Sequence, residues 1–506
     1  MEKVHYKIHL LKSLLKGLIP LVFLLFAGKP LFAFNGGTYT INSGAAASAS
    51  NYVSFTAFVN DLRNITRGDG GPANYNLGGA GLQGSLTVNV ASGSGPYNQQ
   101  ISIPSILGMS SSRTITINGN GTTLSFTPTS TAAGAVLDLN GADFFTFNNL
   151  TIVNNATFGY CAWLRSAADN NSFSNCNFRC PSMLGSTTGT AYVWISNGTT
   201  SPFTYANAAN NNLFENNNFR TANSNGPYYG IVMVGPTSTS LNNASSGNRF
   251  LNNNIQNWRY CGFYAAYTNN TTFEGNTVHN TDYTVTSLKY GIYLNYTNGV
   301  FDRNRLFNLD GSNVTANTQY PIYFYNYNNV TRNSTLNNNA VHCRTTGFNY
   351  NYIYNYASVF GSTLSIVNNT FAHVSNTTVL NNSTTYVVYG GYWNVFRNNI
   401  ISCDFQGAGT KYLYYDFSGL SPASFSHNNF DLRTSGTSYF AYVSGAARST
   451  MSDLYQAGFP TNNINVDPDF INENATSDLH PTAVLMANKG SSIPGLVIDL
   501  RGNNRS

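Results

Sequence analysis

Two carboxylates in the middle of the chain have the spacing of a catalytic pair. Glu274 and Asp302 directly follow Phe273 and Phe301, which open two successive copies of one short motif. If those copies stack as neighbouring strands, the carboxylates lie about 5 Å apart, as in a retaining glycosidase. The chain has no Asp-Asp pair and no Gly-His-Gly triplet to accompany them. We therefore interpret them as solvated outward side chains and predict no catalytic residue, with a polysaccharide lyase or glycoside hydrolase kept as the alternative.

The histidines and acidic residues do not have metal-site spacing. His279 and His342 occupy one repeat position two copies apart, which separates them by about 10 Å, too far to share an ion. Asp467 and Asp469 suggest Ca²⁺, but that ion needs six or more oxygen ligands, so a turn is the preferred interpretation. We predict no metal and no cofactor, and we interpret the cysteines as small buried residues rather than disulfides.

A column of aromatic residues is the feature that suggests binding. Successive residues of a strand point to opposite faces, so Tyr293 points outward if Ile292 points inward. Aromatic rings stack on sugars and are enriched at protein interfaces, although they also suit strands for packing alone. The predicted ligand contacts are Trp163, Trp194, Tyr264, Tyr293, Tyr323, Tyr354, Tyr389, Tyr414 and Tyr442.

A repeat defines these positions. Its clearest copies, Phe214–Phe219 and Phe250–Ile255, have an apolar residue, Asn three positions later, and an apolar residue two beyond that. An amide at one position of stacked copies can donate to one neighbour and accept from the other, which predicts a buried ladder. Its predicted members are Asn148, Asn217, Asn253, Asn276, Asn304, Asn339, Asn369, Asn399 and Asn428.

The repeat predicts the architecture. Two short strand patterns in each period of about 30 residues, with no helix between them, exclude leucine-rich and helical repeats. We predict an all-β fold, a right-handed parallel β-helix of about 13 coils with a helical cap at each end, from Ser54 to Leu62 and from Thr450 to Ala457. The predicted boundaries are a signal peptide at 1–33, an N-terminal cap at 34–83, the β-helix at 84–445, and a C-terminal cap and tail at 446–506.

The first residues resemble an export signal. Four lysines precede an apolar run from Leu18 to Gly28, and a small-residue cleavage site follows. Without residues 1–33 the chain has 20 basic and 19 acidic residues, because five lysines and Glu2 are lost from 25 and 20, so its net charge is +1. We predict a secreted or cell-surface protein with no nucleic-acid partner and no membrane span in the mature chain.

The chain resembles the right-handed parallel β-helix proteins of bacterial surfaces, especially those exported by the type IX route. The resemblance implies an adhesin-type surface module, and it implies that the closing segment forms the last coil. Because such modules usually precede further domains, it also implies either a truncated product or the first part of a longer polypeptide. The matching segments are Gly37–Ile41, Ser54–Leu62, Val88–Asn98, Ile115–Gly121, Asp467–Phe470 and Asp499–Arg505.

Together these patterns predict a non-catalytic extracellular scaffold. It is expected to act in surface adhesion or glycan binding through its outward aromatic column. The predicted partner is an extracellular glycan or a cell-surface protein.

Overall fold

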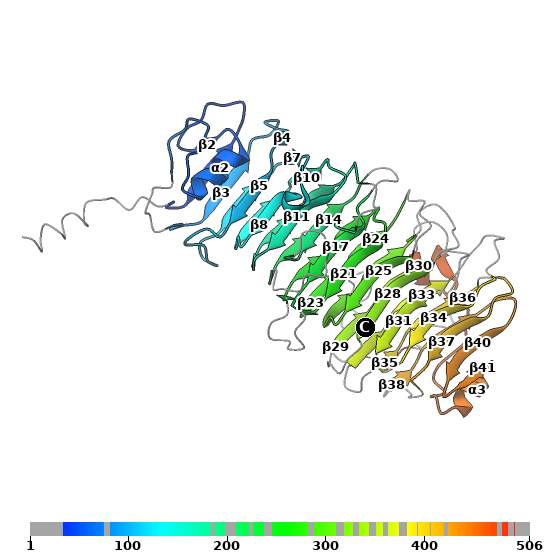
Figure 1. Cartoon of the computed structure of the whole chain (residues 1–506). Coiled ribbons are helices and arrows are strands. Elements are labelled where there is room, and N and C mark those ends of the chain that lie inside the picture. The colour runs from blue at the N-terminus through cyan, green and yellow to red at the C-terminus, as the bar shows by residue number, and fades with distance from the viewer. Residues whose placement is uncertain are drawn as a thin grey trace, which may run out of the picture.

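The chain forms an elongated rod of stacked coils, with helix α2 (Phe55–Leu62) near one end and helix α3 (Met451–Gln456) at the other (Figure 1). The predicted signal peptide and the tail from residue 491 lie outside the described residues. The computed structural model describes residues 34–74, 81–183, 188–197, 209–221, 226–236, 245–281, 288–309, 318–326, 333–343, 351–357, 363–373, 382–391, 393–404, 406–418, 424–472, 478–483 and 490.

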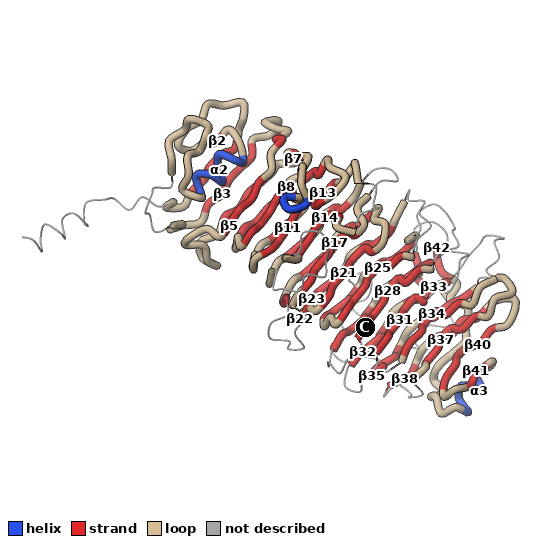
Figure 2. The backbone as a smooth tube through the Cα atoms, viewed as in Figure 1, coloured by secondary structure: helices blue, strands red, loops and turns tan. Residues whose placement is uncertain are grey.

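The strands form three long sheets, which Figure 2 shows as rows of tubes. Sheet A contains β2 (Asn51–Tyr52), β1 (Gly37–Ile41), β3 (Leu86–Val90), β6 (Ile115–Asn118), β9 (Phe145–Asn148), β12 (Ser172–Ser174), β15 (Leu213–Glu215), β19 (Arg249–Leu251), β23 (Thr271–Glu274), β26 (Gly299–Asp302), β29 (Asn333–Asn337), β32 (Thr363–Val367), β35 (Trp393–Arg397) and β38 (Ser424–Ser426). Sheet B contains β4 (Tyr97–Asn98), β7 (Thr123–Phe126), β10 (Thr151–Asn154), β13 (Asn177–Arg179), β16 (Asn218–Phe219), β20 (Asn254–Gln256), β24 (Thr277–His279), β27 (Arg305–Phe307), β30 (Ala340–Cys343), β33 (Thr370–His373), β36 (Ile400–Cys403) and β39 (Asn429–Leu432). Sheet C contains β5 (Ile101–Pro104), β8 (Ala135–Asn140), β11 (Gly159–Arg165), β14 (Thr190–Ile195), β17 (Tyr229–Val234), β21 (Cys261–Ala266), β25 (Lys289–Asn295), β28 (Gln319–Asn326), β31 (Asn351–Ala357), β34 (Thr385–Gly390), β37 (Lys411–Asp416), β40 (Ser438–Val443) and β41 (Ala446–Arg448). The described elements also include two short strand pairs and the short helix η1 (Thr131–Ala133). The pairs are β18 (Ser245–Ser246) with β22 (Thr268–Asn269), and β42 (Phe470–Asn472) with β43 (Asp478–Pro481).

Each coil has three strands, one in each sheet, rather than the two expected from the sequence. Among the described residues, the 12-stranded sheet B therefore marks twelve complete coils, which we number from β3–β5 (coil 1) to β38–β40 (coil 12). Equivalent strands of successive coils pair in parallel, as β15 does with β19. The predicted right-handed parallel β-helix is confirmed, and the repeat motif spans the bend from sheet A to sheet B.

The core lies inside the coils, and in it the same type of side chain stacks on its equivalent in the next coil. Phe147, Phe173, Phe214 and Phe250 of sheet A are at most 1% exposed. Their rings stack from coil to coil with centroids 4.9, 4.9 and 5.2 Å apart. In-register parallel pairing produces such columns because equivalent residues of successive coils lie about 4.8 Å apart.

Asparagines form a ladder at the bend from sheet A to sheet B. The Nδ2 atom of Asn217 donates to Oδ1 of Asn253 at 3.0 Å, and Asn253 donates in the same way to Asn276 at 2.9 Å. The backbone N–H of each ladder residue donates to the same Oδ1 atom as its amide does, which satisfies buried groups that would otherwise lack partners. The bonds continue without a gap through Asn304, Asn339, Asn369, Asn399 and Asn428 to Asn463.

The structure corrects the predicted ladder at its N-terminal end. Asn148 pairs in register with Ser174 and lies half-exposed on sheet A, outside the ladder. The register instead aligns Phe147 with Phe173, so Leu150 is the equivalent of Cys176. The sequence Phe145-Thr146-Phe147-Asn148 allows two frames, and the prediction used the wrong one.

The residue before each ladder position from Asn217 to Asn428 has a left-handed backbone. Asn216, Asn252 and Asn368 have φ values of 55°, 53° and 56°. Asn tolerates this conformation better than other side chains do, and Gly adopts it freely. This requirement explains why Asn or Gly precedes the ladder Asn in most copies, although Arg303 and His427 adopt the same conformation in two of them.

Replacing Asn368 with Val is expected to lower the free energy of unfolding by about 2 kcal/mol, because a β-branched residue is strained in the left-handed region. Asn368→Gly should be close to neutral at the same position. Chemical denaturation of the two variants and the parent measures the difference. Equal stability of the Val and Gly variants would contradict this explanation of the motif.

An N-terminal cap closes the first coil. Ser54 caps α2 by accepting a hydrogen bond from the backbone N–H of Ala57 at 3.0 Å. The buried face of the helix includes Phe55, whose ring meets that of Tyr97 edge to face at 5.2 Å. The expected cap helix is confirmed, and it covers core that an open end would expose.

The C-terminal segment closes the last coil and then turns back. A capping box at Thr450 starts α3, and the Phe459 ring packs on Phe425 at 4.6 Å. Phe470 of β42 and Leu479 of β43 are buried against Ala340, Ala372 and Ile400 of sheet B. Just before this segment the chain adds part of a further rung, because Ile464 pairs in parallel with Asn429 and Asn463 extends the ladder. Asp467–Phe470 itself folds back over the outer side of sheet B. The rest of the expected last coil, Asp499–Arg505, lies outside the described residues.

Candidate functional site

The outer side of sheet C displays two aromatic columns. On β25, Tyr290 and Tyr293 belong to the outer cluster, while Ile292 and Leu294 belong to the core. A Cβ on Gly291 would meet the core side chain of Leu306 at 2.8 Å, so this position also points inward. Two consecutive inward residues interrupt the alternation, which brings residues three apart onto the outer side.

The sequence analysis identified one of these columns and missed the other. The predicted column includes Tyr293 and Tyr323, which pair in register. The missed column lies three residues earlier on each strand, and its aromatic members recur often enough to be visible in the sequence as a Tyr-x-x-Tyr spacing. They are Tyr160, Tyr229, Tyr290, Tyr320, Tyr386, Tyr412 and Tyr439.

The first three residues of the predicted column are buried. Trp163, Trp194 and Tyr264 are 1%, 0% and 2% exposed. They belong to an outer hydrophobic cluster on sheet C against which Tyr228 and Tyr260 also pack. Their prediction as ligand contacts is therefore wrong for an extended ligand, because such a ligand cannot reach their rings along this stretch.

The prediction that Tyr414 points outward is also wrong. It pairs in register with Val388 of the inward column and is fully buried in the core. Its hydroxyl donates to the Asp416 carboxylate at 3.1 Å. Tyr415 takes the outward position beside Tyr389 and Tyr442.

Half-exposed rings cover the outer side of sheet C from coil 7 to coil 12, and we call this surface the tyrosine face. Each of these coils contributes a ring to the second column, and four of them also contribute one to the first. The tyrosine face consists of Tyr320, Tyr386, Tyr412 and Tyr439 in the first column, and Tyr293, Tyr323, Tyr354, Tyr389, Tyr415 and Tyr442 in the second.

From Tyr323 to Tyr442 the rings of the second column stack on one another. Tyr354 and Tyr389 lie 5.0 Å apart at 18°, Tyr389 and Tyr415 5.0 Å apart at 14°, and Tyr415 and Tyr442 4.5 Å apart at 6°. Across the columns, Tyr412 meets Tyr415 edge to face at 88°. From Tyr323 to Tyr442 the rings therefore turn their faces toward neighbouring tyrosines of the column, whereas Tyr293 meets Tyr323 edge to face at 72°.

Phenol hydroxyls ordinarily titrate near pH 10, so a tyrosine surface is uncharged at neutral pH. Desolvation, with a smaller contribution from neighbouring tyrosines, raises the pKa of Tyr386, Tyr412 and Tyr415 above the ordinary value. A protonated phenol can both donate and accept a hydrogen bond. The tyrosine face is therefore a neutral surface of hydroxyl groups repeated from coil to coil.

The carboxylate pair has the predicted position and a cation between its members. Glu274 and Asp302 pair in register on β23 and β26. Arg303 forms an ion pair with Glu274 and a second with Asp302 at 3.2 Å, and the Asn338 amide donates to Asp302 at 3.0 Å. This arrangement binds the carboxylates to protein groups and serves to hold adjacent coils together.

The candidate metal ligands are dispersed or bonded elsewhere. Phe307 separates the two histidines, because it pairs in register with His279 on one side and with His342 on the other. The His279 ring stacks on the Phe307 ring with centroids 4.8 Å apart. Asp467 forms an ion pair with Arg433 at 2.8 Å and accepts a hydrogen bond from the backbone N–H of Asp469. Within the described ranges, no group of three or more His, Cys, Asp and Glu residues is placed to hold a metal ion.

The helices of the described residues include none that is long and apolar enough to cross a membrane.

Comparisons with known proteins find similar chains among solved structures. No protein-family model and no curated protein matches the chain. Two solved structures of PfbA, a surface adhesin of Streptococcus pneumoniae, are similar to it at 12% sequence identity. One match covers 71% of this chain and 79% of that chain with a TM-score of 0.30, and the other covers 76% and 86% with a TM-score of 0.29.

Proposed function

We propose that the protein is a non-catalytic scaffold of the extracellular surface, and that it acts in adhesion by binding an extended, uncharged glycan along the tyrosine face. The observation that carries this proposal is the regular row of half-exposed tyrosines over six successive coils, from Tyr293 to Tyr442, whose rings stack from Tyr323 onward. The extracellular location rests on the export signal predicted for residues 1–33.

The geometry of the rings supports a strand-like ligand. The ring centroids lie 4.5 to 5.0 Å apart along Tyr354, Tyr389, Tyr415 and Tyr442. A similar ring and hydroxyl therefore recur at every one of these coils. Each coil then adds a small, similar contribution, so affinity grows with ligand length through multivalency. A polymer lying along the rod axis gains from this repetition, whereas a compact ligand meets only one or two coils.

The chemistry of the rings supports a neutral polyhydroxyl ligand. Protonated phenol groups donate to and accept from hydroxyls, and they supply no charge to attract an ion. Because stacked neighbours cover the ring faces, recognition relies on ring edges and hydroxyls and not on sugars stacking over exposed rings. The expected affinity per coil is accordingly low.

The variant Tyr412→Phe/Tyr415→Phe/Tyr442→Phe tests this proposal. Phe keeps the stacking and removes only the hydroxyls, so the fold is expected to persist while binding weakens about tenfold or more, at roughly 1 kcal/mol per lost hydrogen bond. A glycan array followed by affinity measurements on oligomers of increasing length provides the readout.

The matched control is Tyr160→Phe/Tyr229→Phe/Tyr264→Phe, which makes the same change in the buried part of sheet C. It should bind like the parent. Undiminished glycan binding in a folded face variant would refute the proposed contact surface. Binding to a cell-surface protein instead of any glycan, lost in the same variant, would keep the surface and change the class of partner.

A further inference from the structure

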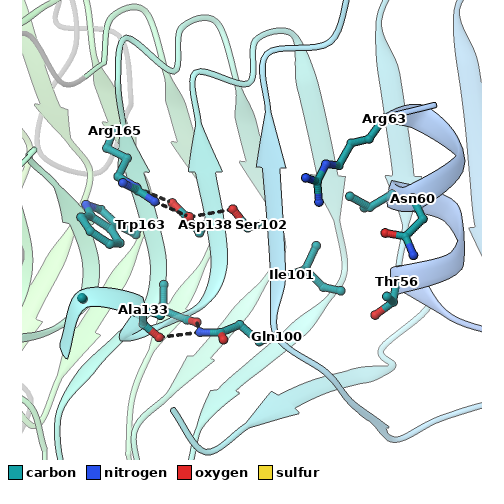
Figure 3. A pocket seen from close by; sticks show the side chains of 13 residues that line it. Thr56, Asn60, Arg63, Gln100, Ile101, Ser102, Ala133, Asp138, Trp163 and Arg165 are labelled. Atoms are coloured by element: carbon teal, nitrogen blue, oxygen red, sulfur yellow. Dashed lines mark hydrogen bonds and ion pairs between the residues drawn. The ribbon is translucent and has the colours of Figure 1, made fainter. Parts of the chain in front are cut away.

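A pocket of about 320 Å³ lies between α2 and the outer side of sheet C at coils 1 to 3 (Figure 3). It is separate from the tyrosine face, because the buried residues Trp194 and Tyr229 lie on the same sheet between the two. Its volume falls at the lower end of small-ligand sites and suits a single sugar residue. The lining residues are Thr56, Val59, Asn60, Arg63, Gln100, Ile101, Ser102, Ala132, Ala133, Ala135, Asp138, Trp163 and Arg165.

The helix forms a polar wall. Thr56, Asn60 and Arg63 are spaced by four and three residues, so they share one face of α2, opposite the buried Phe58 and Leu62. Figure 3 shows Arg63 extending from the end of the helix toward the sheet. Arg63 is exposed, which leaves its guanidinium accessible to a ligand in the pocket.

Sheet C forms the opposite wall of the pocket, where hydrogen bonds hold one arginine and one aspartate together. Arg165 donates to both oxygens of Asp138 at 2.9 Å, and the Ser102 hydroxyl donates to Asp138 at 2.8 Å. Arg165 also lies over the Trp163 ring, 4.2 Å from its centroid. Asp138 is thereby neutralised within the wall.

The pocket therefore has a net positive charge with neutral polar groups around it. Arg63, Arg165 and Asp138 are its charged lining residues, and together they sum to +1. The Gln100 amide donates to the carbonyls of Ala133 and Ala135 at 2.5 and 2.7 Å, which directs its oxygen away from them as an acceptor. Alkyl groups such as the Ile101 side chain supply apolar contact.

We infer that this pocket binds one carboxylate-bearing sugar residue, a uronic acid. Arg63 would pair with the carboxylate, since guanidinium and carboxylate groups form strong charge-assisted hydrogen bonds. Asn60, Thr56 and Gln100 would bind ring hydroxyls, and the apolar lining would contact the C–H groups of the ring. The protein would then have two distinct glycan-binding sites, a neutral extended face and an acidic-sugar pocket.

Saturation-transfer NMR and calorimetry with three probes test the inference. Methyl β-D-glucuronide carries both ring and carboxylate, methyl β-D-glucoside lacks the carboxylate, and acetate lacks the ring. The glucuronide is expected to bind at least about tenfold more tightly than either of the others, which corresponds to about 1.4 kcal/mol. Equal binding of glucoside and glucuronide would refute carboxylate recognition, and equal binding of acetate would reduce the pocket to a simple anion site.

Variants assign the binding to this pocket. Arg63→Gln should abolish the preference for glucuronide over glucoside, whereas Arg179→Gln, which removes an exposed arginine of sheet B, should leave it unchanged. Ala132→Trp, at an exposed lining position, should block all three probes even if Arg63→Gln perturbs the helix end. Unchanged glucuronide binding in the folded Arg63 and Ala132 variants would overturn the assignment.

The two sites are tested independently. The triple Phe variant of the tyrosine face should keep full glucuronide binding, because its substitutions lie in coils 11 and 12 and the pocket lies in coils 1 to 3. Failure of the pocket would leave glycan binding along the tyrosine face unaffected. Loss of glucuronide binding in the face variant would refute the location proposed here.

Discussion

Replacing Asn253 with Leu is expected to lower the free energy of unfolding by about 4 kcal/mol. Asn253 accepts hydrogen bonds from the backbone N–H and the side-chain amide of Asn217, both at 3.0 Å. It donates to the carbonyl of Phe214 and to Asn276, both at 2.9 Å. Leucine fills a similar volume but removes all four bonds, and the buried groups of Asn217 have no water to replace them.

Asn218→Leu is the matched control for this prediction. Asn218 is the next residue along the chain from a ladder position, and it lies half-exposed on β16. The same chemical change there should cost less than about 1 kcal/mol, because water can satisfy the groups left behind. Chemical denaturation distinguishes the two variants, and equal midpoints for Asn253→Leu and the parent would contradict a stabilising ladder.

The ladder shows what the sequence could predict. When one amide residue recurs at the same position of a solenoid, each copy can satisfy its hydrogen-bonding groups by bonding to its equivalents in the adjacent coils. The bonds from Asn217 to Asn428 have this arrangement. Asn463 was missed because the chain makes an antiparallel turn and a helix before it returns to the stack. Its segment therefore lacks the motif by which the other members were recognised.

The aromatic columns show where sequence reasoning failed. The two-residue period places Tyr293 outward, as the structure has it, but it cannot anticipate a strand with two consecutive inward residues. At Leu413 and Tyr414 that irregularity shifted the assignment by one residue, and Tyr415 took the outward place. The same irregularity concealed the first column.

Burial was the second source of error. Trp163 and Trp194 occupy the same register positions as the half-exposed Tyr323, and the periodic pattern gives no sign that they differ. These rings are buried in an outer cluster of sheet C against which Tyr228 and Tyr260, residues that directly precede β17 and β21, also pack. The two-residue alternation along a strand contains no information about such packing.

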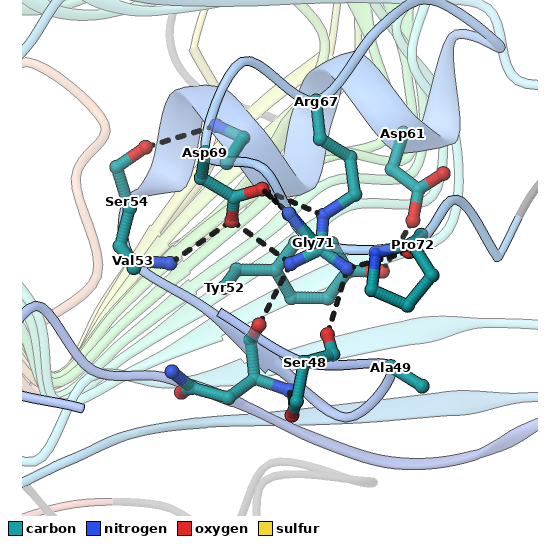
Figure 4. A network of polar contacts seen from close by, with 12 residues as sticks. Ser48, Ala49, Tyr52, Val53, Ser54, Asp61, Arg67, Asp69, Gly71 and Pro72 are labelled. Carbon is teal, nitrogen blue, oxygen red and sulfur yellow. Dashed lines mark hydrogen bonds and ion pairs between the residues drawn. The ribbon is translucent and has the colours of Figure 1, made fainter. Parts of the chain in front are cut away.

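Replacing Arg67 with Met is expected to detach the N-terminal cap, at a cost of about 3 to 5 kcal/mol, because it leaves a buried carboxylate without its partner. Arg67 forms an ion pair with Asp69 at 2.8 Å, and the two side chains are 1% and 2% exposed. Its guanidinium also donates to the carbonyls of Ser48, Asn51 and Pro72 at 2.8, 2.7 and 2.8 Å (Figure 4). It lies 4.0 Å from the centroid of the Tyr52 ring, so one side chain joins three segments of the cap.

Loss of this cap should expose the first coil. With α2 detached, sheet A would present an open strand edge and the core would meet water, which favours association between chains. Hydrogen exchange should therefore increase over residues 34–74 first, and light scattering should rise before the rest of the rod unfolds. Arg67→Met/Asp69→Asn should recover part of the loss, since the second change removes the uncompensated charge. A single Met variant with parental exchange rates in the cap would refute this role.

The same network predicts how the cap responds to acid. Burial raises the pKa of Asp69, but hydrogen bonds from Arg67 and from the backbone N–H groups of Gly71 and Val53 outweigh it and hold the pKa below its usual 3.8. A carboxyl whose pKa is lowered by folding stabilises the folded state above its unfolded pKa, and the contribution is lost as pH falls through the folded value. Cap stability should therefore be constant from neutral pH down to about pH 5 and should fall below about pH 4, near the ordinary Asp pKa. In Asp69→Asn that part of the decline should be absent, and hydrogen exchange of residues 34–74 at pH 7, 4 and 3 measures it. An identical acid profile in parent and Asp69→Asn would show that another group controls the cap.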